Sequence, residues 1–467
     1  MNPLETSLPP IGSPEEARLF LDDPVGCMAQ LNRDYGDAVV FQNGGTNLVF
    51  AFGMDHNREI LTRPDDFHIV SCFPGPRNSP QRRFCSGLFS MNGEQHQNHR
   101  RLLTPPFRKE ELPIQLAPIQ RIIDARVANW RVGQVVDLAQ EMKEITLQLT
   151  TNLLFGLDEL GGAHEVEKLF EEWLNLNHAV SFSVWLPCEM PKENYAKLLD
   201  TATRLEEQLK LLLHQKHSGG DDANDLLAIL MRAKQSGAIS ETEVIGQTVT
   251  LYNAAYHTTA YALTWNLFLL AQHPETARQL LDELDDQLGD ATPTAPVLEK
   301  LPVLDRAIKE GLRLLPPVVY MPRLTPNATR LGSYNLPAST FVMPSPYVTH
   351  HQESIFPEAN AYRPERWLSP PPHYGYIPFG GGNRLCLGAP LAMMIVRATI
   401  AAIWPRFRLS VVPGSRIERT GTLTMEAKFG IPVQLHRQDR RFAASQVVGN
   451  IHEMVDLPVA LPRRIAA

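Results

Sequence analysis

Cysteine is scarce in this sequence, and its few occurrences form no pattern. The five residues, Cys27, Cys72, Cys85, Cys188 and Cys386, are odd in number and include no C-x-x-C pair. Paired spacings are the usual mark of disulfide frameworks and structural zinc sites, so we expect neither. The usage is typical of a reducing compartment, which predicts a cytoplasmic protein.

Other absences exclude further classes of protein. No dense run of lysine and arginine occurs and the net charge is −7, so a nucleic-acid-binding surface is not expected. No G-x-G-x-x-G follows a strand-like segment, which argues against a fused flavin or nicotinamide domain. Residues 1–22 are rich in proline and glutamate without an apolar centre, so we expect neither a signal peptide nor a membrane anchor.

One long segment lacks charge altogether. From Val244 to Pro274 there is no Lys, Arg, Asp or Glu, and the segment is long enough to span a bilayer. Polar side chains nevertheless recur through it, among them Gln247, Asn253 and Asn266. Such a helix is better explained as the buried spine of a large helical protein than as a membrane span.

What the sequence does contain is mostly helical spacing. The predicted helices are 119–130, 136–155, 165–176, 195–217, a long one that begins after Ser240, 274–288, 304–315 and 389–403. Ser240 and Glu243 form a capping-box pattern at the start of the long helix. Pro118 is typical of a helix start and is placed there for the first of these helices.

Strand signals are fewer and shorter. Two apolar runs, 37–41 and 46–50, flank Asn43-Gly44-Gly45, which predicts a hairpin. No repeat or linker divides the chain, so we expect a single domain over residues 1–436, mainly α-helical with small β-sheets. The segment 437–467 has weaker patterning and is treated as a C-terminal extension of unknown role.

Cys386 carries the clearest chemistry. It lies in F-G-G-G-N-R-L-C-L-G, residues 379–388, just before the helix predicted at 389–403. Free amide groups and the positive end of a helix dipole favour a thiolate there, and the glycines let the backbone approach a large flat partner. A buried, inert cysteine is the alternative interpretation. The order of Phe, Gly, Cys and Gly resembles the haem-binding loop of the cytochrome P450 family.

The resemblance implies a cofactor and its ligands. It predicts the cytochrome P450 fold and haem b, with Cys386 as the axial thiolate and the haem between the long central helix and the helix after the cysteine. Phe379, Gly380 and Gly388 are the cofactor-binding loop positions. Side chains that match the family's propionate-binding positions are His96, Arg100, Arg323 and Arg384. Taken alone, His96 and Arg100 are also consistent with an ordinary polar helix face.

A charge network is expected on the side of the cysteine. Glu310 and Arg313 are three residues apart on a helix and can pair, although most such pairs are weak surface bridges. In the family, an E-x-x-R motif at this point is completed by an arginine in a P-E-R-[FW] segment, which matches Arg366 here. The resemblance therefore predicts that Glu310, Arg313 and Arg366 form a buried structural network.

The middle of the long helix departs from the family pattern. Thr258 matches the hydroxyl residue that stabilises bound dioxygen, whereas His257 replaces the usual acid and Ala255 the usual glycine. A histidine titrates near neutral pH and can relay protons. A lone histidine on a buried helix is as often structural. Both interpretations of His257 stay open.

The resemblance predicts a monooxygenase that inserts one atom of O2 into a lipophilic small molecule of secondary metabolism, such as a terpenoid or polyketide. Electrons would come from a separate ferredoxin-type or flavodoxin-type partner, with Arg101, Arg108 and Lys109 as candidate contacts. The substrate pocket is expected at 67–90, 177–185 and a set of further positions: Tyr252, Ala255, Tyr256, Val318, Val319, Leu423 and Thr424. The alternatives are a haem-thiolate enzyme for oxidative cyclisation, coupling or peroxide-driven oxidation, and a non-catalytic haem sensor.

Overall fold

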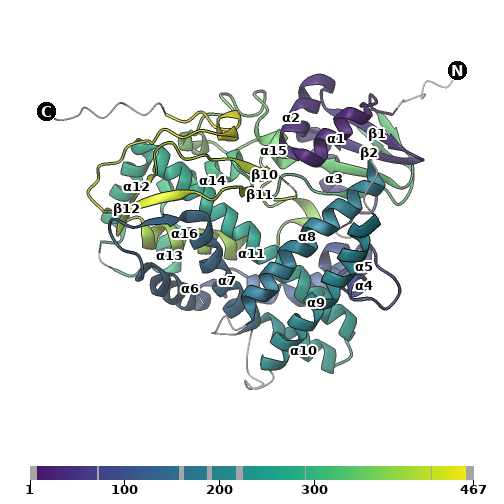
Figure 1. Cartoon of the computed structure of the whole chain (residues 1–467), viewed down its shortest axis with the longest axis horizontal. Helices are drawn as coiled ribbons and strands as arrows, with labels where there is room; N and C mark the ends of the chain where they lie inside the picture. The colour runs from purple at the N-terminus through teal and green to yellow at the C-terminus, as the bar shows by residue number, and fades with distance from the viewer. Residues whose placement is uncertain are drawn as a thin grey trace.

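Helices build most of the molecule, and a smaller β-rich region with the first helices lies at one end (Figure 1). The computed structural model describes residues 8–70, 73–156, 162–186, 192–216, 225–289, 291–421 and 423–458. This architecture is the expected one, mainly α with small sheets.

The first half of the chain carries α1 (Pro14–Asp22), α2 (Pro24–Tyr35), α3 (Met54–Thr62), α4 (Pro80–Phe84), α5 (Gly93–Leu103), α6 (Leu112–Val127), α7 (Leu138–Phe155), α8 (Ala163–Trp185) and α9 (Lys192–Lys216). The second half carries α10 (Leu226–Gln235), α11 (Glu241–Gln272), α12 (Pro274–Gln287), α13 (Ala295–Leu298), α14 (Pro302–Leu314), α15 (Pro346–His350) and α16 (Ala389–Ile403).

The largest described sheet has the strand order β1-β2-β8-β5-β3, from Ala38–Asn43, Thr46–Ala51, Thr340–Pro344, Arg323–Leu324 and His68–Ile69. β1 and β2 form the predicted hairpin in antiparallel register, and β2 runs parallel to β8. A second sheet pairs β4 (Val135–Asp137), β12 (Pro432–Arg437) and β9 (Phe407–Val411). Two small pairs complete the described strands: β6 (Thr329–Leu331) with β7 (Tyr334–Leu336), and β10 (Arg419–Gly421) with β11 (Met425–Ala427).

α11 is the buried spine that its uncharged sequence predicts. The capping box is present: Glu243 N donates to Ser240 Oγ at 3.2 Å, and Ser240 N donates to the Glu243 carboxylate at 2.8 Å. From Val244 to Gln272 all side chains are buried except those of Asn253, Ala254, Ala255 and Thr258. These four lie on one stretch of the helix and line a cavity, together with buried residues of the same helix such as Val249, Thr259 and Ala262.

Several helix boundaries differ from the predicted ones for local reasons. Pro118 does not start a helix: α6 begins at Leu112, and Pro113 takes the first-turn position where a missing N–H costs little. α8 continues to Trp185 instead of ending at residue 176, because apolar spacing persists through the predicted pocket segment. Residues 135–137 form β4 and not the start of α7, since Val135 and Val136 pair with β12.

The described part of the tail, residues 437–458, packs on the helical body. The Phe442 ring stacks on Trp404 with centroids 5.8 Å apart. Gln272 and Ser445 exchange two hydrogen bonds of 3.0 and 2.8 Å. These contacts tie the tail to α11 and α16.

The cysteines need one correction. Cys27 and Cys386 are free, as expected, but Cys85 is disulfide-bonded. A single bond leaves no trace in cysteine count or spacing, which is why the sequence pattern missed it. Cys72 and Cys188 lie outside the described residues. Within the part of the chain that the structure describes, no helix combines the length and apolar character needed to cross a bilayer.

Candidate functional site

The candidate site is a cavity of about 410 Å³ between α11, α8 and the loop before α16. A volume in this range is typical of a small-molecule site. The sequence-predicted residues on its wall are Cys386, Phe379, Gly380, Gly388, His96, Arg100, Arg323, Arg384, Ala255, Thr258, Val318, Leu423 and Thr424. Residues far apart in the chain thus meet around one space.

The cysteine loop is shaped by its glycines. Cys386 N donates to Phe379 O at 2.9 Å and closes the loop. Gly380 and Gly382 have φ of 70° and 59°, a region that favours glycine. A Cβ at Gly382 would overlap the carbonyl of Leu61. The loop therefore holds the thiol at the start of α16, where Gly388 is the N-cap residue.

The electrostatics of Cys386 balance two opposing influences. Its thiol lines the cavity and is accessible from it, although the residue lies deep in the molecule. Burial is the larger influence and raises the pKa of the thiol, while the backbone N–H groups of Gly388 and Ala389 and the charge of Arg100 lower it. The helix start alone therefore does not offset the effect of burial on the pKa of the thiol.

One buried arginine, Arg323, and two half-buried ones, Arg100 and Arg384, converge on the same cavity. Arg323 Nη1 donates to the carbonyl of Pro322 at 2.8 Å, Arg384 Nη2 to Met91 O at 2.8 Å, and Arg100 Nη2 to Leu385 O at 2.8 Å. Burial and then the neighbouring arginine lower the pKa of Arg323 and of Arg384 to about 10. Like charges held together in this way mark a site that requires anions.

His96 joins the arginine cluster as a neutral donor. Burial, followed by the charges of Arg384 and Arg100, lowers the pKa of His96 to about 4. Within the described residues no carboxylate pairs with Arg100, Arg323 or Arg384. Uncompensated guanidinium groups beside an accessible thiol fit a flat ligand that carries a metal and two carboxylates, and haem with its propionates has this composition.

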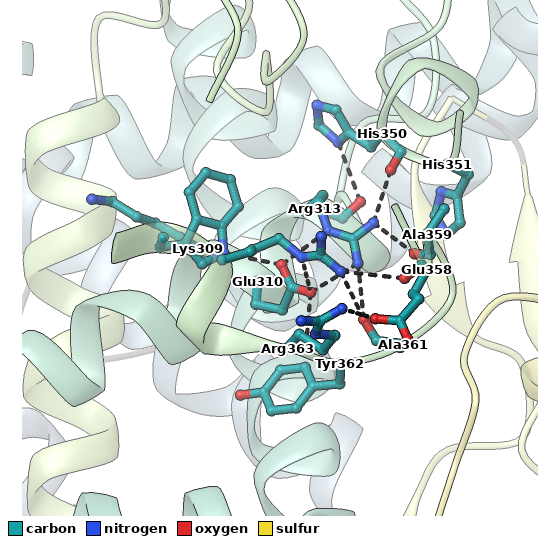
Figure 2. Close-up of polar contacts among 12 residues, drawn as sticks. Lys309, Glu310, Arg313, His350, His351, Glu358, Ala359, Ala361, Tyr362 and Arg363 are labelled. Carbon is teal, nitrogen blue, oxygen red and sulfur yellow. Dashed lines mark hydrogen bonds and ion pairs between the residues drawn. The ribbon is translucent and has the colours of Figure 1, made fainter. Parts of the chain in front are cut away.

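Glu310, Arg313 and Arg366 form the predicted network, and Figure 2 shows its core. Arg313 Nε and Nη2 donate to the two oxygens of Glu310 at 2.9 and 2.8 Å, and Arg366 Nε donates to Oε1 at 2.9 Å. Trp367 Nε1 and Arg363 N bring the carboxylate to five hydrogen bonds. The side chains of Glu310 and Arg313 have no exposed surface.

Backbone carbonyls complete the surroundings of Arg313. Its Nη1 donates to the carbonyls of His350 and Ala359 at 2.8 and 2.7 Å, and Nη2 donates to Ala361 O at 3.1 Å (Figure 2). The guanidinium therefore has partners on every side, which a buried charge requires. The network joins α14 to the segment 359–367.

His350 is a structural residue that the sequence motifs did not reveal. Its Nδ1 donates to Arg313 O at 3.2 Å, and its Nε2 accepts from Ile377 N at 2.9 Å. Ile377 O in turn accepts from Gly380 N at 3.0 Å. His350 thus links the charge network to the cysteine loop, and only its place at the end of an apolar run hinted at a buried histidine.

Thr258 and His257 are neighbours in α11 but face different ways. Thr258 lines the cavity, and its hydroxyl donates to Ala254 O at 2.6 Å, so the oxygen is left free to accept a hydrogen bond. His257 is buried, is not on the cavity wall, and lies among the rings of Tyr256, Tyr261 and Phe170. The cavity therefore presents the hydroxyl and not the imidazole.

His257 borders a charged cluster that reaches the surface. Its Nε2 lies 3.5 Å from Glu171 Oε1, at the limit of hydrogen-bond distance, and neither ring nitrogen has a better partner among the described residues. Lys143 Nζ bridges Glu171 and Glu426 at 3.0 and 2.6 Å. His257 and then Lys143 lower the pKa of Glu171 to about 2 against the effect of burial. Glu171 is 39% exposed, so this cluster connects His257 to solvent.

The predicted pocket positions divide into two groups. Ala255, Val318, Leu423 and Thr424 lie on the cavity wall. Tyr252, Tyr256 and Val319 do not, and this expectation is corrected. The Tyr256 hydroxyl donates to Glu167 on α8, the Tyr252 ring packs against Phe170, and Val319 is buried in the core. These two tyrosines project toward α8 because they occupy another face of α11 than Ala255 and Thr258.

The remaining wall is mostly apolar, with a few polar side chains. α8, α7 and α16 contribute apolar wall residues, among them Leu149, Leu153, Phe182, Leu391 and Val396. His178 of α8 and Tyr320 also line the cavity, and His178 Nε2 lies 2.6 Å from Tyr320 Oη. An apolar wall with few polar points is typical of a site for lipophilic molecules.

Comparison with known proteins gives consistent matches. The family model described as Cytochrome P450 matches residues 3–433. Cyclooctatin synthase of Streptomyces melanosporofaciens is 29% identical over 361 residues, which are 73% of this chain and 77% of that protein. Cyclooctat-9-en-7-ol 5-monooxygenase of the same organism is 27% identical over 394 residues, 82% and 84% of the two chains. The solved structure of retinoic acid bound cyanobacterial CYP120A1 has the same fold, with a TM-score of 0.78 and 23% identity over 92% of this chain and 99% of that one.

Proposed function

Because this chain belongs to the cytochrome P450 family and is a haem-thiolate monooxygenase, we propose that Cys386 binds the haem iron and that the same cavity receives a lipophilic substrate. The supporting observation is one space that joins the Cys386 thiol, three arginines without carboxylate partners among the described residues, and a long apolar wall. When bound, the haem supplies the oxygen and electron chemistry. The protein binds, orients and shields the reactants.

The arginine cluster accounts for the two haem carboxylates. Arg100, Arg323 and Arg384 bring three charges, and His96 adds a neutral N–H donor. A carboxylate that enters a low-dielectric cavity needs such partners. In return, each carboxylate relieves the repulsion among the guanidinium groups, so cofactor binding and the stability of this region are coupled.

The substrate class follows from the wall and from relatives. The apolar side chains of α7, α8 and α16 favour a lipophilic molecule of medium size. Two relatives carry the names cyclooctatin synthase and cyclooctat-9-en-7-ol 5-monooxygenase. A terpenoid or similar secondary metabolite, hydroxylated or epoxidised, is the substrate that fits both observations.

Thr258 and His257 are proposed as the proton-delivery residues. The Thr258 oxygen is free to accept a hydrogen bond from a cavity ligand. His257 is its neighbour in the chain and lies 3.5 Å from Glu171, which reaches solvent. Protons would pass from Glu171 to His257 and on to the Thr258 side of the helix through a turn of the imidazole ring or a water molecule.

Variants of the cluster test proton delivery. His257→Phe and Glu171→Gln should each lower the product formed per electron consumed, because protons then arrive too slowly and electrons are lost to other products. Glu167→Gln is the matched control, since Glu167 is one turn away on α8 and bonds Tyr256 instead of His257. If all three variants keep the wild-type coupling, His257 is structural.

The electron donor is proposed to be a separate ferredoxin-type or flavodoxin-type protein. Arg101 and Arg108 are exposed, whereas Lys109 Nζ pairs with Glu299 at 2.9 Å. An acidic partner protein could replace Glu299 as the ion-pair partner of Lys109. Such contacts weaken as the salt concentration rises. The cytoplasm stays the predicted location.

Two measurements test the proposed function. The reduced, carbon-monoxide-bound protein should show the red-shifted band of a thiolate-bound haem, and Cys386→Ser should remove that band while Cys27→Ser should not. Product made under labelled dioxygen should carry one labelled oxygen. Unlabelled product, or turnover with peroxide that exceeds turnover with reductase, would favour the cyclisation, coupling or peroxide alternative, which the departure at His257 motivates.

A further inference from the structure

A polar pair on the cavity wall has no part in cofactor binding or proton delivery. His178, in the middle of α8, and Tyr320, between α14 and β5, meet with Nε2 and Oη 2.6 Å apart. Their rings are held by aromatic neighbours: Phe182 lies 4.6 Å from His178 and 6.0 Å from Tyr320 between centroids, and Phe20 lies 5.6 Å from Tyr320. The pair is thus a fixed polar point on a wall that is mostly apolar.

Tyr320 and His178 differ in which of them can donate the hydrogen bond between them. Burial lowers the pKa of His178 to about 4 and raises that of Tyr320, so both side chains are neutral at pH 7. Among the described residues, His178 Nε2 is the only hydrogen-bond partner of the Tyr320 hydroxyl. Tyr320 is 1% exposed, whereas His178 keeps part of its surface open on the cavity, so we assign Tyr320 as the donor to Nε2 and place the ring proton of His178 on Nδ1.

The second ring nitrogen of His178 is then a donor in need of an acceptor. No described residue makes a hydrogen bond to Nδ1, and His178 keeps part of its surface open on the cavity. Hydroxyls elsewhere on the wall differ: Thr146 and Thr258 donate to the carbonyls of Met142 and Ala254 and offer lone pairs. His178 offers an N–H.

We propose that His178 Nδ1–H donates a hydrogen bond to an oxygen that the substrate already carries, so that the enzyme acts on an alcohol, ether or ketone of a lipophilic skeleton and discriminates against the bare hydrocarbon. Tyr320 is a positioning residue that fixes the tautomer. The inference rests on the proposed function, namely a lipophilic substrate in this cavity. A bare hydrocarbon would leave a desolvated donor unpaired, which weakens its binding.

An enzyme with this requirement has a defined place in a reaction sequence. An oxygen must be installed on the skeleton before this enzyme acts, by an earlier oxidation or by capture of water during ring formation. The product then carries at least two oxygen functions. A cavity that binds one oxygen at His178 holds the skeleton in a single orientation, so the second oxygen should enter at one position.

The experiment compares matched probes on the haem-loaded enzyme. Binding is followed by the substrate-induced spin-state shift for adamantane and 2-adamantanone, and for 5α-androstane and 5α-androstan-17-one. In the wild type each ketone should bind about tenfold more tightly than its hydrocarbon, as one hydrogen bond to a buried donor implies. The ratio within a pair cancels general changes in packing or haem content.

Variants test whether His178 causes this difference in affinity, expressed as the ratio of the hydrocarbon Kd to the ketone Kd. His178→Phe should bring it to about one, while His178→Gln, which restores an N–H donor, should recover part of it. Tyr320→Phe should lower it about threefold, because the ring proton is then shared between both nitrogens. Ser183→Ala on the same helix should leave it unchanged, since the Ser183 hydroxyl bonds Val180 O.

Each outcome decides between the two proposals. Equal binding of ketones and hydrocarbons by the wild type, or an unchanged ratio in His178→Phe, overturns the role of His178 and leaves the proposed function intact. Binding of neither probe class overturns the lipophilic substrate itself and this inference with it. If His178→Phe does not load haem, Tyr320→Phe and His178→Gln decide by the same ratio.

Discussion

Replacing Glu310 by alanine should be among the most damaging single changes in this protein. The substitution removes the acceptor of five hydrogen bonds and leaves the Arg313 guanidinium, which has no exposed surface, without its counter-charge. Breaking a buried pair in this way costs about 3–5 kcal/mol. That loss is a large part of the roughly 5–15 kcal/mol by which domains are stable.

Two further variants give smaller expected losses in the free energy of unfolding, for comparison with Glu310→Ala. Arg366→Ala should cost less, about 1–3 kcal/mol, because Arg366 touches solvent and Glu310 keeps its two bonds from Arg313. Arg58→Ala breaks an exposed pair with Asp55 and should change stability by less than about 0.5 kcal/mol. The order Glu310, Arg366, Arg58 is therefore the expected order of damage.

The assay is urea unfolding followed by far-ultraviolet circular dichroism, with haem content measured on the same samples. Glu310→Ala should unfold at much lower urea and retain little haem, since the network reaches the cysteine loop through His350. Stability within 1 kcal/mol of wild type, together with full haem content, would refute the reasoning.

Three more predictions follow from buried charge and close packing. Burial holds the pKa of His350 well below the value of about 6.5 for an unfolded histidine. The free energy of unfolding is therefore at its full value above about pH 6.5 and falls as the pH is lowered. Each such histidine contributes a slope of about 1.4 kcal/mol per pH unit. His350→Gln should flatten this slope in urea midpoints measured between pH 7 and 5; an unchanged slope would contradict the assignment. Arg323→Leu should speed haem transfer to apomyoglobin about tenfold or more, because a charge-assisted contact is lost, whereas Arg330→Leu at the surface should not. Gly246→Ala should lower the melting temperature by several degrees, since a Cβ there would overlap the backbone of Ser86, and an unshifted melting curve would show that the loop can move aside.

Local signals in the sequence predicted local structure well. The hairpin of β1 and β2, the capping box of α11 and the bounds of α16 depend on residues a few positions apart, and the structure has them as predicted. The end of α8 was predicted too early, at residue 176, although apolar residues continue at helical spacing to Trp185.

The side chains of the site also divide into those that local sequence predicts and those that depend on distant partners. The cysteine loop could be predicted from the sequence because Gly380 and Gly382 have positive φ angles that the loop's own backbone requires. The direction of His257 and the link made by His350 depend on partners at 171 and 377, and no spacing encodes such distant pairs. Which face of α11 borders the cavity also depends on packing, which is why Tyr252 and Tyr256 were misassigned.

The partly exposed stretch of α11 is short, which limits where this enzyme can evolve new selectivity. Asn253, Ala254, Ala255 and Thr258 are the only side chains between Val244 and Gln272 that are partly exposed. Most substitutions along this helix therefore disturb packing on all sides before they reach a ligand. New selectivity is more accessible at the partly exposed wall residues of α8, Leu174 and His178. Directed evolution of this protein should accumulate its specificity changes on α8 and leave the central helix nearly untouched.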